Sequence, residues 1–222
     1  MKKVDRGRYY TWLFQAAEVF YERGNFEKAL KYFERLIKQH GKFLETSMKA
    51  DCYAYLGDIH LFNEDYSKAI EYLNRAISLD GEFAHYYYLL GMVYQTQENW
   101  RRAIEEFQRA VKNEPKNSIY LEELGRTYIF TGNLHEGEKQ LRKAWKLDHT
   151  NIGSGVELAG VLFSLNKFKE TVAMIHEIFE SGESLHDGIV DYLESLRQDA
   201  ERGLEEQAKR RRKQKKRSSK QT

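Results

Sequence analysis

Apolar and small residues recur at helical spacing in two groups within residues 84–117. Members of each group lie three or four residues apart, so each group predicts one helix with one apolar face. A short polar break separates the groups, which predicts two antiparallel helices packed on each other. Pro115 ends the second helix, because proline cannot donate the helical hydrogen bond. The residues of the two faces are Tyr87, Leu90, Gly91 and Tyr94, and then Trp100, Ala103, Phe107 and Ala110.

The same pattern returns at intervals of 34 residues on both sides of this unit. Residues 50–83 and 118–151 match it closely, because Gly57 and Gly125 are displaced from Gly91 by 34 residues in either direction. We therefore expect three consecutive helix pairs of the same construction in the middle of the chain.

Two weaker copies flank these three, at residues 10–43 and 152–185. Six extra residues follow the first copy, which predicts a longer connection or an extended helix there. The last copy has Thr171 and Ile178 where the others have small residues at the second helix crossing. Weak terminal copies are expected in a stack of repeats, since an end unit meets solvent or a cap on one face.

This arrangement resembles the tetratricopeptide repeat, whose 34-residue pattern is Trp/Leu-Gly/Tyr/Ala/Phe/Ala/Pro. The resemblance implies an all-α fold, a right-handed superhelical solenoid of antiparallel helix pairs with five repeats over residues 10–185. Helical RNA-processing repeats of similar length are the alternative, but the small residues at the crossings favour the tetratricopeptide form. These small residues are Gly57, Ala69 and Ala76 in one unit and Gly91, Ala103 and Ala110 in the next.

The two ends of the chain depart from the repeats. We expect an N-terminal segment over residues 1–9 and, over residues 186–208, an amphipathic helix that caps the last repeat. Residues 209–222 contain no apolar residue. They form either the frayed end of that helix or, as we expect, a basic disordered tail.

Composition fits a nearly all-helical chain with a substantial core, because 41% of its 222 residues are hydrophobic and only one is proline. Cys52 is the only cysteine, so no intramolecular disulfide and no cysteine-based zinc site can form. We expect its thiol to be buried. No apolar stretch predicts a signal peptide or a transmembrane segment. We therefore expect a soluble protein located in the cytoplasm, with the nucleus as an alternative location if the cell is eukaryotic.

No constellation of residues points to catalysis, to a metal or to a cofactor. The seven histidines form no metal-ligand spacing on one helix. The sequence contains no glycine-rich phosphate loop, nucleophile elbow or Cys/His pair. We therefore expect a protein that is not an enzyme and needs no cofactor.

The resemblance implies a binding groove instead, because positions 2, 5, 9, 12 and 13 of each repeat face the concave surface in this family. Aromatic residues and methionine at these positions are the usual material of binding hot spots, and acidic residues there favour a basic partner. We expect an interaction scaffold or adaptor that binds a protein or peptide with apolar anchors and some Lys or Arg. The candidate groove residues are Phe14, Glu18, Tyr21, Asp58, Phe62, His85, Tyr88, Met92, Glu122, Arg126 and Phe130.

Two qualifications apply to this groove. Phe62, Phe130 and Phe163 have an alternative interpretation, in which each merely contacts the next helix pair. The carboxylate clamp of chaperone adaptors is excluded, because none of the matching positions holds the required lysine, arginine or asparagine. Those positions hold Phe14, Glu18, Tyr55, His85 and Leu89.

A second functional hypothesis comes from the segregation of charge. Residues 209–220 hold nine Lys or Arg and no acid, while the rest of the chain has 27 basic against 34 acidic residues. The alternative function is therefore tethering to a polyanion, such as RNA, DNA or an anionic membrane surface. Without interleaved aromatic residues, the tail offers no platform for reading a nucleotide sequence. Its candidate residues are Lys209, Arg210, Arg211, Arg212, Lys213, Lys215, Lys216 and Arg217.

Overall fold

The structure, a computed structural model, describes residues 6–218. Regular structure in this part of the chain is entirely helical, with eleven α-helices, one π-helical turn and no strand. The expected all-α fold class is therefore confirmed. The elements are α1 (Arg6–Glu22), α2 (Phe26–Arg35), η1 (Leu36–His40), α3 (Thr46–Phe62), α4 (Tyr66–Leu79), α5 (Ala84–Thr96), α6 (Trp100–Asn113), α7 (Ser118–Phe130), α8 (Leu134–Leu147), α9 (Ile152–Ser164), α10 (Phe168–Glu180) and α11 (Asp187–Ser218).

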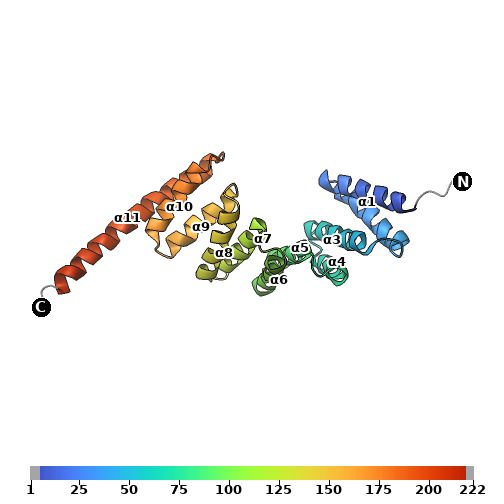
Figure 1. The fold of residues 1–222 in the computed structure, drawn as a ribbon, viewed down its shortest axis with the longest axis horizontal. Helices are drawn as coiled ribbons and strands as arrows, with labels where there is room; N and C mark the ends of the chain where they lie inside the picture. Colours follow the sequence, from blue (N-terminus) through green and yellow to red (C-terminus); the bar gives the residue numbers. More distant parts are fainter. Residues whose placement is uncertain (1–5, 219–222) are drawn as a thin grey trace. The chain divides into compact units, whose positions relative to one another are not determined.

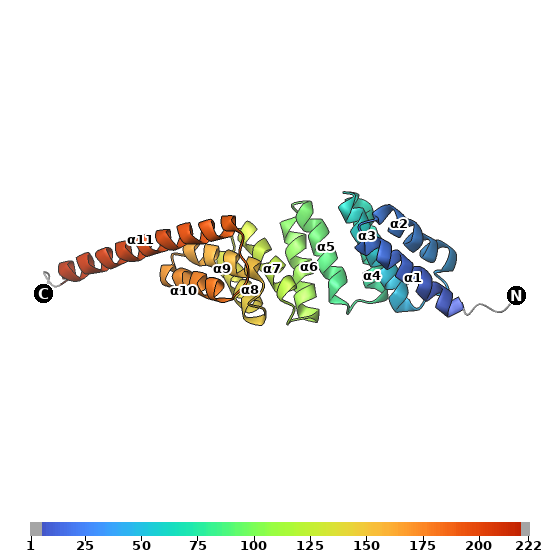
Figure 2. The ribbon, with the colours of Figure 1, turned by 90° about the horizontal axis from the view of Figure 1, so that it is seen from above.

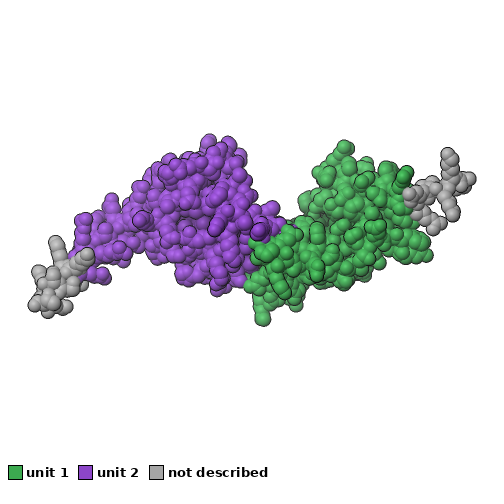
Figure 3. All heavy atoms as spheres, in the orientation of Figure 1, with its two compact units in different colours: residues 1–115 green, residues 116–222 purple. Residues whose placement is uncertain are grey.

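The chain forms two compact units, unit 1 over Met1–Pro115 and unit 2 over Lys116–Thr222 (Figure 3). Helices pack as consecutive pairs, α1/α2, α3/α4 and α5/α6 in unit 1 and α7/α8 and α9/α10 in unit 2 (Figures 1 and 2). Within each unit, neighbouring pairs contact each other through α2/α3, α4/α5 and α8/α9. Each pair is closed by a short turn, so its two helices run antiparallel.

These turns share one backbone construction. The residue in the middle of the turn has a positive φ, at 71° in Gly24, 59° in Glu64 and 57° in Glu98. Glycine adopts this conformation without strain, whereas the two glutamates hold it because helices on both sides fix the chain. The residue that follows caps the second helix. The caps are Asn25, Asp65 and Asn99, whose side chains accept hydrogen bonds from the amides of Lys28, Lys68 and Arg102.

A glycine in the first helix lets the two helices of a pair approach closely. A Cβ atom on Gly57 would lie 2.6 Å from Leu73, and one on Gly91 would lie 2.6 Å from the ring of Phe107. Leu73 and Phe107 are completely buried. The larger residue of the second helix therefore fills the space that the glycine leaves, which is why the spacing of small residues predicted the crossings.

The six extra residues between the first two repeats, 44–49, are divided between the connection and the start of α3. After α2, the chain makes a π-helical turn over Leu36–His40, and α3 then begins at Thr46, four residues before the repeat predicted from residue 50. Leu36 is fully buried. The prediction allowed a longer connection or an extended helix. The structure has both, because the connection after η1 is longer and α3 begins earlier than the predicted repeat.

The N-terminal helix begins earlier than we expected. α1 starts at Arg6, so part of the predicted N-terminal segment, residues 1–9, belongs to the first repeat; residues 1–5 lie outside the described residues. At the other end of the chain, α11 contacts α10 and α9 and buries Leu193, Leu196 and Ala200. The expected C-terminal capping helix is therefore confirmed.

The expectation of a disordered tail over residues 209–222 does not hold for residues 209–218, because α11 continues to Ser218; residues 219–222 lie outside the described part. No glycine or proline follows Gly203 to interrupt the helix. Two pairs of opposite charge one turn apart also support it. They join Lys209 to Glu205 at 3.7 Å and Arg210 to Glu206 at 3.8 Å. No helix of the described chain is long and apolar enough to cross a membrane.

Replacing Gly91 with alanine tests the close approach of the helices. The new methyl group would overlap the buried ring of Phe107, and overpacking of this kind costs about 1–3 kcal/mol. Alanine recovers roughly 1 kcal/mol in helix propensity, so we expect a net loss of about 1 kcal/mol in the free energy of unfolding, measured by urea denaturation. Gly188→Ala in α11 is the matched control, because a Cβ atom there meets no atom within 4 Å. Equal stability of the two variants would contradict the proposed crossing.

Candidate functional site

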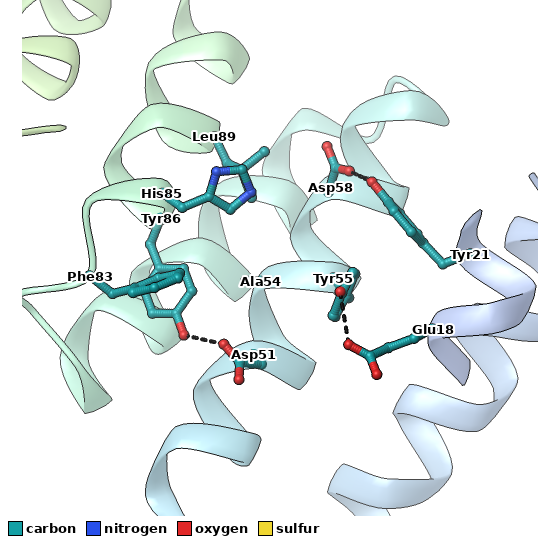
Figure 4. A pocket seen from close by; sticks show the side chains of 10 residues that line it. All are labelled: Glu18, Tyr21, Asp51, Ala54, Tyr55, Asp58, Phe83, His85, Tyr86 and Leu89. Carbon is teal, nitrogen blue, oxygen red and sulfur yellow. Dashed lines mark hydrogen bonds between the residues drawn. The ribbon is translucent and has the colours of Figure 1, made fainter. Parts of the chain in front are cut away.

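The first helices of unit 1 line a hollow of about 360 Å³, the unit 1 pocket (Figure 4). It is open enough to hold a side chain and its polar head. It brings together four of the predicted groove residues from three different helices, namely Glu18 and Tyr21 of α1, Asp58 of α3 and His85 of α5. The full lining consists of Glu18, Tyr21, Asp51, Ala54, Tyr55, Asp58, Phe83, His85, Tyr86 and Leu89.

Three tyrosine hydroxyls bind three carboxylates across the wall of this pocket. Each hydrogen bond joins the first helices of neighbouring repeats (Figure 4), so the carboxylates are held in place by the packing of the repeats. A carboxylate has about four lone-pair sites, and one hydroxyl uses only one of them. The pairs are Tyr55 with Glu18 at 3.1 Å, Tyr86 with Asp51 at 2.6 Å, and Tyr21 with Asp58.

The pocket has no cationic lining residue at neutral pH. Desolvation by its neighbours lowers the pKa of His85 although part of the side chain is exposed, and the charge of Asp58 opposes this shift; the lowered pKa favours the neutral imidazole. Burial also raises the pKa of Glu18; the hydrogen bond from Tyr55 opposes this shift, and the charges of Glu22 and Asp51 add to it. Burial and a neighbouring carboxylate raise the pKa of each pocket tyrosine, which therefore stays a protonated donor. The pocket thus presents carboxylates without a resident counter-ion.

Other predicted groove residues of unit 1 lie outside the pocket lining. The ring of Phe14 packs 6.1 Å from that of Tyr55, which ties it to the pocket wall. Tyr88 is half-buried and stacks on the His85 ring at 5.6 Å. Met92 is half-buried on the same helix. Phe14 and Tyr88 therefore contact residues of the pocket lining, whereas Met92 lies one helical turn after Tyr88 on α5 and is not part of that lining.

Phe62, Phe130 and Phe163 were expected either to face a partner or to contact the next helix pair, and they differ in solvent exposure. Phe62 is 67% exposed although its ring lies 4.4 Å from that of Phe26. Phe130 is 65% exposed and lines a hollow of about 550 Å³ in unit 2. Phe163 is half-buried, contacts Phe168 at 5.4 Å and packs against the core of unit 2. Phe62 and Phe130 therefore offer apolar surface to a partner, and Phe163 offers much less.

In unit 2 the predicted groove residues Glu122 and Arg126 are bound to each other. The guanidinium of Arg126 contacts three carboxylates, those of Glu122 at 2.7 Å, Glu123 at 2.7 Å and Glu157 at 2.6 Å. Asn151 also donates to Glu122. Burial raises the pKa of Glu157, against the opposing effect of Arg126. Arg126 thus gives all three carboxylates a cationic partner within the unit, whereas the unit 1 pocket has no cationic lining residue.

The same pairing of repeat positions occurs within each unit. The ninth residue of one repeat contacts the sixth residue of the next, as Glu18 contacts Tyr55 in unit 1 and Arg126 contacts Glu157 in unit 2. Sequence reasoning placed the ninth residues and Tyr21 in the groove but missed Tyr55 and Tyr86 as partners of the carboxylates. The signal was available, because the tyrosine–carboxylate pairs are separated by 35 or 37 residues, close to one repeat length.

The basic residues predicted as a polyanion site belong to α11. Residues 209–214 are exposed along the helix, and Lys209 and Arg210 also pair with glutamates one turn earlier. Arg211, Arg212 and Lys213 are exposed as well. Lys215, Lys216 and Arg217 are in the helix, but their side chains lie outside the described ones.

Within the described residues, no group of three or more His, Cys, Asp or Glu side chains is arranged to hold a metal ion. Cys52 is fully buried in α3, and burial raises the pKa of its thiol.

Comparisons with known proteins identify the repeats. Residues 9–82 and 84–117 each match a family model described as tetratricopeptide repeat. No curated protein sequence matches the chain.

Several solved structures have a similar fold. A Pseudomonas aeruginosa PilF structure superposes with a TM-score of 0.70 at 17% identity, covering 93% of each chain. A crystal structure of MamA gives a TM-score of 0.65 at 19% identity, over 74% of this chain and 93% of that one. YrrB, described as a TPR protein with an unusual peptide-binding site, gives 0.60 at 17% identity, over 77% of this chain and 84% of its own. At these identities the likeness establishes the fold alone.

Replacing Arg126 with methionine tests the charge network of unit 2. Loss of the guanidinium would leave three closely spaced, largely buried carboxylates without a cation, and we expect a loss of about 3 kcal/mol in the free energy of unfolding at neutral pH. Repulsion would raise the carboxyl pKa values of the folded variant above their unfolded values. The loss should therefore be present above those values and shrink as the pH falls and the carboxylates take up protons.

The measurement is urea denaturation of wild type and variant at neutral and at acidic pH. Arg75→Met is the matched control, since Arg75 pairs with Glu71 on an exposed surface and should contribute less than about 1 kcal/mol. A loss at Arg126 that is no larger than at Arg75, or that is independent of pH, would contradict the network.

Proposed function

Because this chain is a tetratricopeptide repeat protein over residues 9–117, we propose that it is an interaction scaffold whose unit 1 pocket binds a basic peptide segment of a partner protein. Proteins with this repeat act generally as interaction modules. The peptide-binding site in the description of the similar YrrB structure supports a peptide as the ligand. The proposal assigns the ligand chemistry from the pocket of this chain alone.

The presence of three tyrosine-bound carboxylates without a cationic lining residue carries this proposal. A lysine or arginine of the ligand would supply the missing positive charge and donate to the lone pairs that the tyrosines leave free. The tyrosines hold the carboxylates in position before binding, which reduces the entropy lost when the complex forms. Glu18, Asp51 and Asp58 are therefore the residues that we assign to recognition of the basic side chain.

Apolar surface beside the carboxylates supplies the second part of the recognition. Phe83, Ala54 and Leu89 line the pocket, and Phe83 is 43% exposed. Phe62 extends the apolar surface along the end of α3. We propose that an apolar or aromatic residue of the ligand packs here next to its lysine or arginine, as is usual for the centre of a peptide interface.

A peptide-display selection against the full chain tests this function. We expect the selected peptides to combine Lys or Arg with a neighbouring apolar residue. The triple variant Glu18→Gln, Asp51→Asn, Asp58→Asn keeps an acceptor for each tyrosine and removes the charges. It should weaken binding of a selected, fluorescently labelled peptide by at least about tenfold, since hydrogen bonds to charged groups contribute about 1.5–3 kcal/mol each.

The matched control removes three carboxylates from exposed positions on the second helices, as Glu27→Gln, Glu71→Gln, Glu105→Gln. It raises the net charge by the same amount and should leave the affinity within about twofold, as distant surface charges are screened. Equal weakening in both triple variants would show that the peptide responds to net charge and not to the pocket. Selection of peptides without basic residues would contradict the assigned ligand chemistry.

We also propose a second, weaker candidate function, in which the basic end of α11 tethers the protein to a polyanion. The observation that favours it is the continuation of α11 to Ser218 with residues 209–214 exposed. A helix displays these cations along one rigid element, so several can face the phosphates of a nucleic acid or a membrane at once.

Salt dependence distinguishes the two candidate functions. Engagement of six cations by duplex DNA would give a slope of about −5 for log K against log salt, since each phosphate neutralised contributes about −0.9. Peptide binding in the pocket should depend far less on salt, because apolar burial is not screened. The variant with Lys209, Arg210, Arg211, Arg212 and Lys213 changed to glutamine should lose DNA binding and retain peptide binding. A shallow slope for DNA, or loss of peptide binding in this variant, would contradict the assignment.

A further inference from the structure

A second hollow, of about 550 Å³, lies entirely within unit 2, and we call it the unit 2 hollow. It is formed around α9, the first helix of the last repeat, which contacts both α7 and α11. Each of these two neighbours contributes an exposed aromatic side chain, Phe130 from α7 at 65% exposure and Tyr192 from α11 at 46%. Further apolar lining comes from Ile129, Leu134 and Val161. The volume and the apolar walls are those of a pocket for a ligand group.

A glycine at the ninth position of the last repeat leaves room for this hollow. The same position holds Met92 in the third repeat and Arg126 in the fourth. Gly160 lines the hollow, and the Tyr192 hydroxyl lies so near that a Cβ atom on the glycine would be 3.1 Å from it. A long side chain at this position would therefore enter space that Tyr192 and the hollow now occupy.

One acceptor among the lining residues lacks a donor. Glu157 lines the hollow, and its Oε1 atom accepts a hydrogen bond from Nε of Arg126 at 2.6 Å. Its other oxygen, Oε2, is buried and has no hydrogen-bond partner among the described residues. Buried polar atoms of folded proteins are nearly always paired, because an unpaired acceptor has lost its water and gained no other donor. A ligand that brings a donor to this oxygen would therefore gain free energy of binding that a purely apolar ligand would not.

Charge at this end of the hollow also favours a donor. One guanidinium, that of Arg126, contacts three carboxylates, so the group carries an excess of negative charge. The positive end of an N–H bond complements this charge. Burial raises the pKa of Glu157, and the hydrogen bond and charge of Arg126 oppose the rise, which favours the ionised, accepting form of the carboxylate.

The number of donors and the apolar volume distinguish between ligand groups. A lysine ammonium has three donors, whereas the described lining offers one buried oxygen without a partner. The remaining donors of the lysine would lose water without full replacement. A phenylalanine ring would fill the apolar space but leave Oε2 of Glu157 unpaired. An indole ring combines a large apolar body with a single N–H donor, which is the combination that this hollow matches.

We propose that the unit 2 hollow binds a tryptophan side chain of a partner protein, with the indole ring packed against Phe130 and Tyr192 and its N–H donating to Oε2 of Glu157. The Glu157 side chain is 27% exposed, and the terminal torsion of a glutamate has a broad minimum, so a small rotation of the carboxylate turns Oε2 toward the ligand. Glu157 is thus the residue that selects tryptophan over phenylalanine. The ligand differs in chemistry from the basic ligand of the unit 1 pocket, so either site can be disproved without the other.

Two small ligands of the same shape provide the test, N-acetyl-tryptophanamide and its benzothienylalanine analogue, in which sulfur replaces the indole N–H. Dissociation constants are measured from the amide chemical shifts of the isotope-labelled full chain, and we expect the largest shifts around Gly160. The analogue should bind at least about tenfold more weakly, because it cannot donate to the carboxylate. Glu157→Gln keeps an acceptor for Arg126 and places a donor where Oε2 was. This variant should bind the tryptophan ligand about tenfold more weakly and no longer distinguish the two ligands.

Matched variants separate the hollow from its surroundings. Glu122→Gln removes a carboxylate that contacts Arg126 without lining the hollow and should leave the affinity within about twofold, since its charge acts only at a distance. Phe130→Ser should weaken binding by about tenfold, whereas Phe62→Ser removes a comparably exposed ring from unit 1 and should have no effect. Circular dichroism should show equal helicity in all variants.

Several outcomes would overturn the proposal. These are absence of binding, shifts confined to residues outside the hollow, equal affinity of the wild type for both ligands, and an unchanged preference in the Glu157→Gln variant. The comparison of the two ligands on the wild type decides the matter even if that variant is poorly folded. Tighter binding of N-acetyl-lysinamide than of N-acetyl-tryptophanamide would also overturn it, because the hollow would then select a cation and not an indole.

Discussion

The close approach of two helices at a glycine is the constraint on which the three middle repeats depend. The side chain of Leu73 packs so close to Gly57, and that of Phe107 so close to Gly91, that a Cβ atom on either glycine would overlap its neighbour. A larger residue at either position would push the helices apart, and because buried side chains are closely packed, the shift would reach the neighbouring pair. The glycines thus set the distance within a pair and, through it, the distance between successive first helices.

That distance determines which residues meet across the groove. When the first helices are stacked at a constant separation, the ninth residue of one repeat reaches the sixth residue of the next. Unit 1 uses this relation to hold Glu18 with Tyr55, whereas unit 2 uses it to pair Arg126 with Glu157. The same relation therefore places a tyrosine beside a carboxylate in unit 1 and an arginine among three carboxylates in unit 2.

The sequence predicted the features that recur in every repeat. It did not predict features that depend on the contacts of individual side chains. Glycine and alanine at fixed spacing predicted the crossings, and the groove positions brought Glu18, Tyr21 and Asp58 into one pocket. Tyr55 and Tyr86 were not predicted as pocket residues, because an aromatic residue in a helix has the same pattern whether its ring is in the core or its hydroxyl binds a carboxylate. The helical state of residues 209–218 was not predicted because composition alone favoured disorder, while the pairing of Lys209 with Glu205 depends on helical spacing.

The described chain covers the outer face of the α9/α10 pair but leaves part of α1 exposed. At the end of unit 2, α11 turns an apolar stripe inward through Leu193 and Leu196 and a charged surface outward. At the start of unit 1, Trp12 and Val19 occupy positions that are buried in the inner repeats, yet they remain apolar and are exposed. The apolar surface that α11 shields within the chain is left on α1 as surface whose burial would favour association.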